Sequence, residues 1–73
     1  MALLMNSMTE QEGFINDVLN DAFLKAVENN GKITIPELDS IVMAHPYYEE
    51  VSLDTIEDAV EKIEEILAKN NRI

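Results

Sequence analysis

The sequence has no cysteine, a single histidine and only five Lys and Arg among its 73 residues. Without cysteine, neither a disulfide nor a thiolate metal site can reinforce the fold. The five cations are scattered, whereas a protein that grips phosphates needs clustered Lys and Arg. The same scarcity disfavours attraction to anionic membranes. We therefore expect no direct binding of nucleic acid by the isolated domain and no membrane partner.

Long hydrophobic runs are also missing. No apolar run approaches the roughly 20 residues that span a bilayer. The opening residues 1–5 are apolar, but no basic region precedes them and no cleavage site follows, so they do not form a secretion signal. A cytoplasmic location is the default expectation.

Acidic and apolar residues are abundant. Fifteen Asp and Glu give a formal net charge of -10, and 47% of the residues are hydrophobic, which is too many for a disordered acidic tail. A chain of this length forms one domain with a thin core. We expect residues 1–8 to be a flexible leader and residues 9–73 a single acidic helical domain.

Residues 9–29 carry apolar side chains at four-residue intervals in two adjacent rows, which predicts a helix with a wide apolar face. Thr9 with Glu12 fits a capping box at its start. Gly31 is expected to end this helix, because glycine tolerates the left-handed conformation that closes a last turn. Ile33 and Ile35 alternate with polar neighbours, as in a short strand.

A second helix is predicted from Thr34, which has Glu37 three residues later as a second capping box. It should end before His45, because a residue that precedes a proline resists helix. Residues 45–51 are expected to be a loop. A third helix begins near Ser52 or Asp54 and is stopped by Asn70-Asn71, and residues 72–73 could pair as a strand beside residues 32–34.

Three helices with short connections can share one small core. The predicted fold is therefore mainly α: a compact three-helix domain, expected to be a monomer, with one or two very short strands between the first two helices and at the C-terminus.

The stretch around Gly31 also resembles an EF-hand loop, in which Gly31, Ile33 and Glu37 would occupy positions 6, 8 and 12. Position 1 would be Ala26, where such a loop needs a carboxylate. A helix end followed by a capping box explains Gly31 and Glu37 without a metal, so no metal or cofactor is expected. A degenerate calcium-binding module remains an alternative.

Two further motifs have simpler explanations. Ser52 and Leu53 resemble the Asp-Ser-Leu segment of acyl carrier proteins, but Val51 replaces the aspartate and a helix start accounts for the serine. His45 is the only histidine and has no cysteine or second histidine to act with, so no nucleophile–base pair can be proposed. We do not expect an enzyme.

The last predicted helix is strongly acidic. Asp58–Lys62 and Glu65–Lys69 are spaced as favourable ion pairs, whereas Glu57, Glu61 and Glu64 have no nearby cation. Such a surface either keeps a small protein soluble or attracts a basic partner. The candidate partner-binding residues are Glu49, Glu50, Glu57, Asp58, Glu61, Glu64 and Glu65.

The order of these elements resembles region 1.1 of bacterial housekeeping sigma factors. The matching segments are Asn30-Gly31-Lys32-Ile33-Thr34-Ile35-Pro36-Glu37-Leu38-Asp39 and Leu53-Asp54-Thr55-Ile56-Glu57-Asp58-Ala59-Val60-Glu61-Lys62-Ile63. The resemblance implies an acidic helical domain that mimics nucleic acid and occupies the DNA channel of RNA polymerase, modulating transcription initiation. The sequence departs from the family at Lys32, where an aromatic residue is usual. Because the DNA-binding regions of a sigma factor are missing, we expect an excised domain or a free-standing relative.

A third interpretation is a helical protein–protein adaptor that uses an apolar patch and Tyr47-Tyr48. It predicts binding that resists salt, whereas a nucleic-acid mimic should bind less tightly as salt rises.

Overall fold

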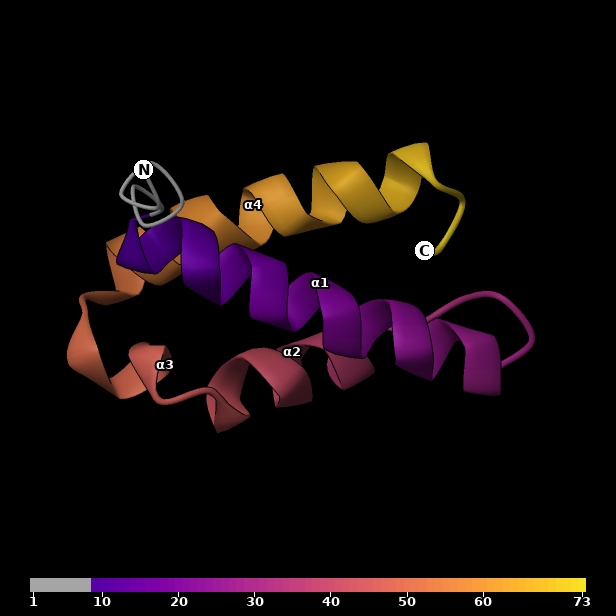
Figure 1. Cartoon of the computed structure of the whole chain (residues 1–73), viewed down its shortest axis with the longest axis horizontal. Helices are drawn as coiled ribbons and strands as arrows, with labels where there is room; N and C mark the ends of the chain where they lie inside the picture. The colour runs from indigo at the N-terminus through magenta and orange to yellow at the C-terminus, as the bar shows by residue number, and fades with distance from the viewer. Residues whose placement is uncertain (1–8) are drawn as a thin grey trace, which may run out of the picture.

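The computed structural model describes residues 9–73, so the predicted leader at residues 1–8 lies outside the described residues. The predicted mainly α fold is confirmed. The described chain forms four helices, α1 (Glu10–Glu28), α2 (Ile35–Ala44), α3 (Tyr47–Glu50) and α4 (Leu53–Lys69), and no strand (Figure 1).

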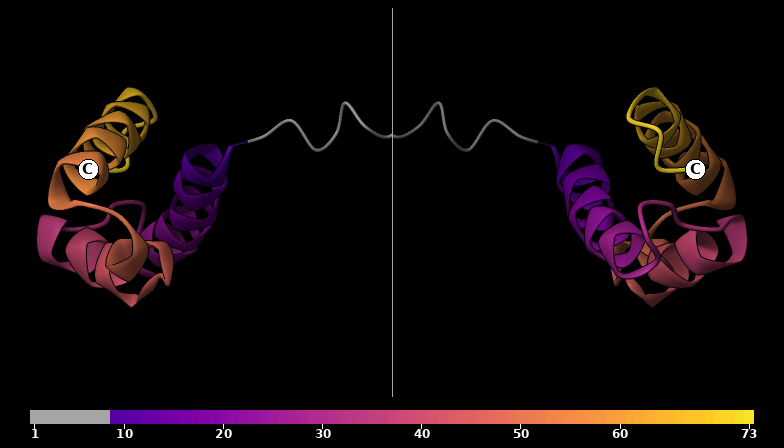
Figure 2. Two further views of the ribbon diagram at one scale, coloured as in Figure 1. Left: turned by 90° about the vertical axis from the view of Figure 1, so that its left-hand side faces the viewer. Right: turned by 90° about the vertical axis from the view of Figure 1, so that its right-hand side faces the viewer.

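The three long helices surround one core. In Figure 1, α1 and α4 run in the same direction, and α2 runs in the opposite direction. The short helix α3 links α2 to α4. The end-on views of Figure 2 show α1, α2 and α4 as three separate rods around a common interior. The buried core consists of Phe14, Val18, Ala22, Ala26, Ile33, Leu38, Val42, Tyr47, Ile56, Ala59, Ile63 and Leu67.

Helix α1 begins where its capping box predicts. The Thr9 hydroxyl accepts from the Glu12 backbone N–H at 3.1 Å, and the Thr9 backbone N–H donates to the Glu12 carboxylate at 2.9 Å. Of the two apolar rows, only the one from Phe14 to Ala26 is fully buried. The neighbouring row is partly buried at its start, and its last member, Val27, is 71% exposed. The core is therefore narrower than the sequence pattern suggests.

The ends of α1 and α4 share one backbone design. After α1, the backbone N–H of Gly31 donates to the Ala26 carbonyl at 2.6 Å, and after α4 that of Arg72 donates to the Leu67 carbonyl at 2.8 Å. These bonds define Schellman motifs, whose left-handed position falls on Asn30 (φ 64°) and Asn71 (φ 58°). The expectation that Gly31 itself takes this position is wrong. Gly31 follows it with φ 113°, which a side chain would strain.

In place of the predicted short strands, residues 31–33 and Arg72 form a joint of hydrogen bonds. The Ile33 backbone N–H donates to the Arg72 carbonyl at 2.7 Å, and the Arg72 guanidinium Nη1 donates to the Gly31 carbonyl at 3.1 Å. The two segments meet side by side as expected. However, one backbone hydrogen bond is too little pairing to make a strand ladder.

The predicted loop at residues 45–51 contains the one-turn helix α3, so the count of three helices is corrected to four. Tyr47 is buried because its ring stacks on Phe14 at a centroid distance of 4.9 Å.

The Tyr47 backbone N–H donates to Nδ1 of His45 at 3.1 Å. Because an N–H can only donate, Nδ1 accepts, and in the neutral ring Nε2 carries the proton toward Asp17, 2.9 Å away. His45 thereby holds α3 to α1.

The two helix ends provide a paired test. Replacing Gly31 with Ala forces a side chain onto a backbone with φ 113° and should lower the free energy of unfolding by about 1–3 kcal/mol. Asn71→Gly relieves a left-handed residue and should leave stability unchanged or raised by less than about 1 kcal/mol. Urea unfolding measures both changes, and equal losses in the two variants would contradict this account.

Candidate functional site

The charges of the molecule are separated along the sequence. Between Lys32 and Lys62 there are eight Asp and Glu and no Lys or Arg. This acidic segment, residues 33–61, comprises α2, α3 and the first half of α4. Lys25 and Lys69 lie instead in the last turns of α1 and α4. Because α1 and α4 run in the same direction, these cations gather at the end of the molecule farther from α3 (Figure 1).

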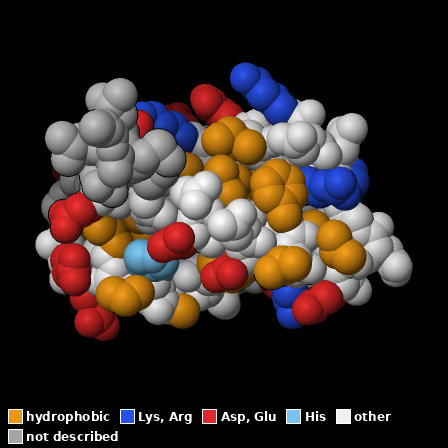
Figure 3. Space-filling view, viewed as in Figure 1, with side chains coloured by type: hydrophobic (Ala, Val, Ile, Leu, Met, Phe, Trp, Pro, Cys, Tyr) orange, Lys and Arg blue, Asp and Glu red, His pale blue; other side chains and the backbone are white. Residues whose placement is uncertain are grey.

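The space-filling view agrees with this separation on the face it shows. In Figure 3, acidic side chains gather at the end where α3 lies, and most basic side chains lie along the α4 edge and at the opposite end. Hydrophobic side chains fill the middle of that face. On this face, the carboxylates are therefore not spread evenly.

An open groove of about 380 Å³ lies between α2 and α4. Its lining contains four carboxylates and six apolar or aromatic side chains but no Lys or Arg, and we call it the α2–α4 groove. Its acidic residues are Asp39, Glu57, Glu61 and Glu64. Its apolar and aromatic residues are Val42, Met43, Tyr48, Leu53, Ile56 and Val60.

Part of the apolar lining of the groove is open to solvent. Val42 and Ile56 belong to the buried core and close the bottom of the groove. Met43 and Leu53 line it while remaining 53% and 64% exposed. The groove therefore exposes apolar side chains to water next to its four carboxylates.

The groove carboxylates carry uncompensated charge. Among residues 9–73, Lys25 and Glu28 form an ion pair at 3.8 Å, and the neutral His45 ring hydrogen-bonds to Asp17 at 2.9 Å. The predicted pairs Asp58–Lys62 and Glu65–Lys69 are not closed to ion-pair distance, which corrects the sequence-based expectation. Such exposed pairs gain little in water against the entropy of the two side chains.

The structure brings together some of the predicted site residues and separates others. Glu57, Glu61 and Glu64 line the α2–α4 groove. Asp58 and Glu65 are exposed on α4 outside its lining, and Glu49 and Glu50 are exposed on α3.

Asp39 was missed by the sequence reasoning, although it faces the same groove from α2. Its position four residues before Met43 and three before Val42 could have placed it beside the apolar face of α2. Only the fold, in which α2 and α4 both pack on α1 and line one groove, shows that Asp39 joins the carboxylates of α4.

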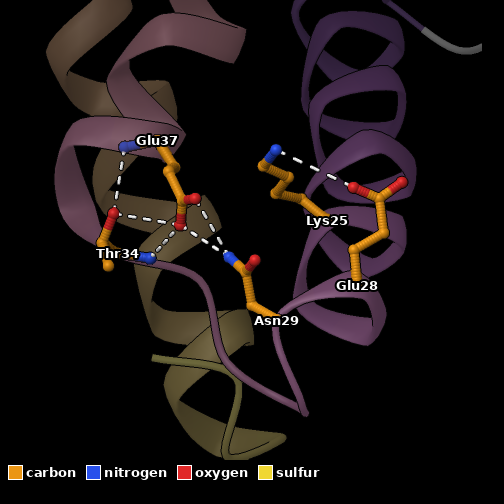
Figure 4. Close-up of polar contacts among 5 residues, drawn as sticks. All are labelled: Lys25, Glu28, Asn29, Thr34 and Glu37. Carbon is orange, nitrogen blue, oxygen red and sulfur yellow. Dashed lines mark hydrogen bonds and ion pairs between the residues drawn. The ribbon is translucent and has the colours of Figure 1, made fainter.

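The alternative calcium site has another structural role (Figure 4). Oε1 of Glu37 accepts hydrogen bonds from the Thr34 backbone N–H at 2.9 Å, the Thr34 hydroxyl at 3.0 Å and the Asn29 amide at 2.8 Å. Asn29 also donates to Oε2 at 3.0 Å. The carboxylate therefore ties the end of α1 to the start of α2. Within the described residues, no cluster of His, Cys, Asp and Glu could hold a metal ion.

These hydrogen bonds change the acidity of Glu37. The Thr34 backbone N–H and then the Asn29 amide stabilise the ionised form, so the pKa of Glu37 lies below its ordinary value of 4.5.

Ser52, the residue that resembles a carrier-protein attachment site, caps α4. Its hydroxyl accepts from the Thr55 backbone N–H at 3.3 Å, so it starts the helix in preference to Asp54.

A second hollow, of about 660 Å³, lies between α1 and α2. It is larger than the α2–α4 groove, but Lys25 and His45 share its lining with Glu28 and Glu37, whose partners are already in place. Its mixed charge gives no preference for a cationic or an anionic partner.

Comparisons with protein-family models, with curated proteins and with solved structures found no match to this chain. None of the helices in residues 9–73 combines the length and the apolar character needed to cross a membrane.

The pKa of Glu37 predicts a pH effect on stability. A lowered pKa in the folded state stabilises the fold above 4.5, and this contribution disappears as the pH falls through the lowered value. Glu37→Gln should therefore melt at a lower temperature than the original protein at neutral pH, with the difference shrinking below pH 4.5. Asp39→Asn removes the same charge from the same helix without a hydrogen bond and is the matched control. Thermal melts followed by circular dichroism measure these differences. A melting-temperature difference between Glu37→Gln and the original protein that did not change with pH would contradict the prediction.

Proposed function

We propose that this domain binds a basic protein surface through the carboxylates of its acidic segment and of the following turn of α4. The single observation that supports this most strongly is the α2–α4 groove, where four carboxylates face solvent with no Lys or Arg in the lining. Keeping like charges together is unfavourable: Glu57 and Glu61 lie four residues apart on one helix, which costs a few tenths of a kcal/mol. A cationic partner removes that repulsion.

We further propose that the partner is bacterial RNA polymerase, in the cytoplasm. The support is the resemblance of residues 30–39 and 53–63 to sigma region 1.1. In this proposal the carboxylates stand in for DNA phosphates in the basic channel of the enzyme, and the domain modulates transcription initiation by leaving when promoter DNA enters. Opposite potentials would speed the encounter, and the exchange would depend on salt. No catalytic step and no cofactor are part of the proposal.

One observation favours the adaptor alternative as well. The apolar part of the groove, with Met43 and Leu53 exposed, is suited to a protein partner and not to a purely ionic contact. Tyr47, by contrast, is buried against Phe14 and is not available to an adaptor surface. The two interpretations differ in how binding responds to salt.

Charge reversal tests the proposal. Glu57→Lys, Glu61→Lys and Glu64→Lys together should weaken polymerase binding by roughly 100-fold at low salt, on the basis of about 1 kcal/mol for each contact. The original protein should bind less tightly as salt rises, and the triple variant should show a shallower salt dependence. Titrations of labelled domain into polymerase at low and high salt measure both effects.

The matched control reverses three carboxylates outside the groove, at Glu10, Asp21 and Glu28 on α1. It changes the net charge by the same amount, so a loss of affinity equal to that of the groove variant would indicate a non-specific effect of charge. Unchanged affinity of the groove variant at both salt concentrations would refute the proposal.

A further inference from the structure

We infer that the α2–α4 groove is the docking site for a cationic amphipathic helix of the partner protein. The apolar face of that helix would cover the apolar part of the groove, and Lys and Arg at its edges would reach the carboxylates. This inference rests on the proposed function, because it names the structural element of a basic partner that the acidic segment binds.

The apolar surface supplies the first argument. Leu53 and Val60 lie seven residues apart on α4, so both face the same side of the helix, two turns from each other. Met43 adds an exposed side chain from α2 on the other wall. A partner made only of positive charge, such as a metal ion, would leave this apolar surface in water. A partner with its own apolar face would cover it.

The shape of the groove supplies the second argument. From Leu53 to Glu64 the wall formed by α4 extends for roughly 16 Å at 1.5 Å per residue. A partner helix of about three turns matches that length and would place apolar residues at i, i+3 or i+4, and i+7. Because both walls are helices, their backbone groups are already hydrogen-bonded. An extended peptide would find no sheet edge to pair with, whereas a helix satisfies its own backbone.

Charge supplies the third argument. Asp39 lies on the α2 wall, whereas Glu57, Glu61 and Glu64 lie on the α4 wall. None of the four has an ion-pair partner among residues 9–73. Carboxylates on both sides of an apolar strip match a helix that carries cations along both edges of its apolar face, and they repel an acidic helix.

The direct test uses a synthetic probe. A helical peptide of about 15 residues, made of Leu and Lys with all Leu on one face, is compared with a peptide of the same composition in scrambled order. The amphipathic peptide should bind about tenfold more tightly than the scrambled one at about 500 mM NaCl, where simple charge attraction is screened. Amide NMR shifts on the unmodified protein should then change along the groove walls of α2 and α4. Equal binding of the two peptides, or shifts confined to α1, would overturn the inference.

Substitutions separate the groove from other apolar surface. Met43→Ser with Leu53→Ser removes exposed side chains from the groove and should weaken the amphipathic peptide about tenfold. Leu24→Ser with Val27→Ser removes side chains of comparable exposure, 64% and 71%, from α1 and should change affinity by less than about twofold. Because all four side chains are half-exposed or more, both variants should stay folded, which circular dichroism checks. Equal losses in the two variants would overturn the inference.

The outcomes for the peptide and for polymerase can be told apart. If the peptide fails to discriminate while charge reversal still weakens polymerase binding, the docking inference is wrong and the proposed function stands. If the peptide binds the groove while polymerase binding ignores the charge reversal, the polymerase proposal is wrong and the groove remains a docking site for a different basic helix.

Discussion

The joint between the end of α1 and the C-terminus is the constraint on which the rest of the structure depends. Two hydrogen bonds, from Ile33 N–H to the Arg72 carbonyl and from Arg72 to the Gly31 carbonyl, hold the start of α2 against the end of α4. The Schellman motifs of α1 and α4 aim both chain segments into this joint. The helices α2 and α4 form the two walls of the candidate groove. The backbone of residues 29–33 and 70–72 therefore influences the distance between the groove carboxylates on α2 and those on α4, although none of these carboxylates lies in either segment.

Local signals in the sequence predicted most of the helical framework. The capping boxes at Thr9 and Thr34 begin α1 and α2, and the proline after His45 marks the end of α2. These features act within a few residues and therefore need no knowledge of the rest of the fold. Helix α3 was missed because one turn is too short to show a period, and its stability comes from the stacking of Tyr47 on Phe14, more than 30 residues away in the sequence.

The candidate site was only partly predictable for the same reason. Acidic residues of α4 could be recognised by their spacing, but the apolar strip beside them and the contribution of Asp39 exist only once α2 and α4 both pack on α1. The expected ion pairs on α4 are absent among the described residues, because long side chains in water gain little by pairing. Charge is thus less neutralised than the i,i+4 pattern suggests, and the surface potential of the acidic segment is correspondingly stronger.

The placement of charged side chains gives the molecule a permanent electric dipole moment. Lys25, Lys69 and Arg72 lie toward the end where both helices finish, whereas Glu49 and Glu50 of α3 and Asp54 at the start of α4 lie at the other end (Figure 1). In the field of a positively charged body such a molecule experiences a torque as well as an attraction. It would rotate during diffusion so that α3 and the start of α4 lead, and the first collision would already present the negative pole.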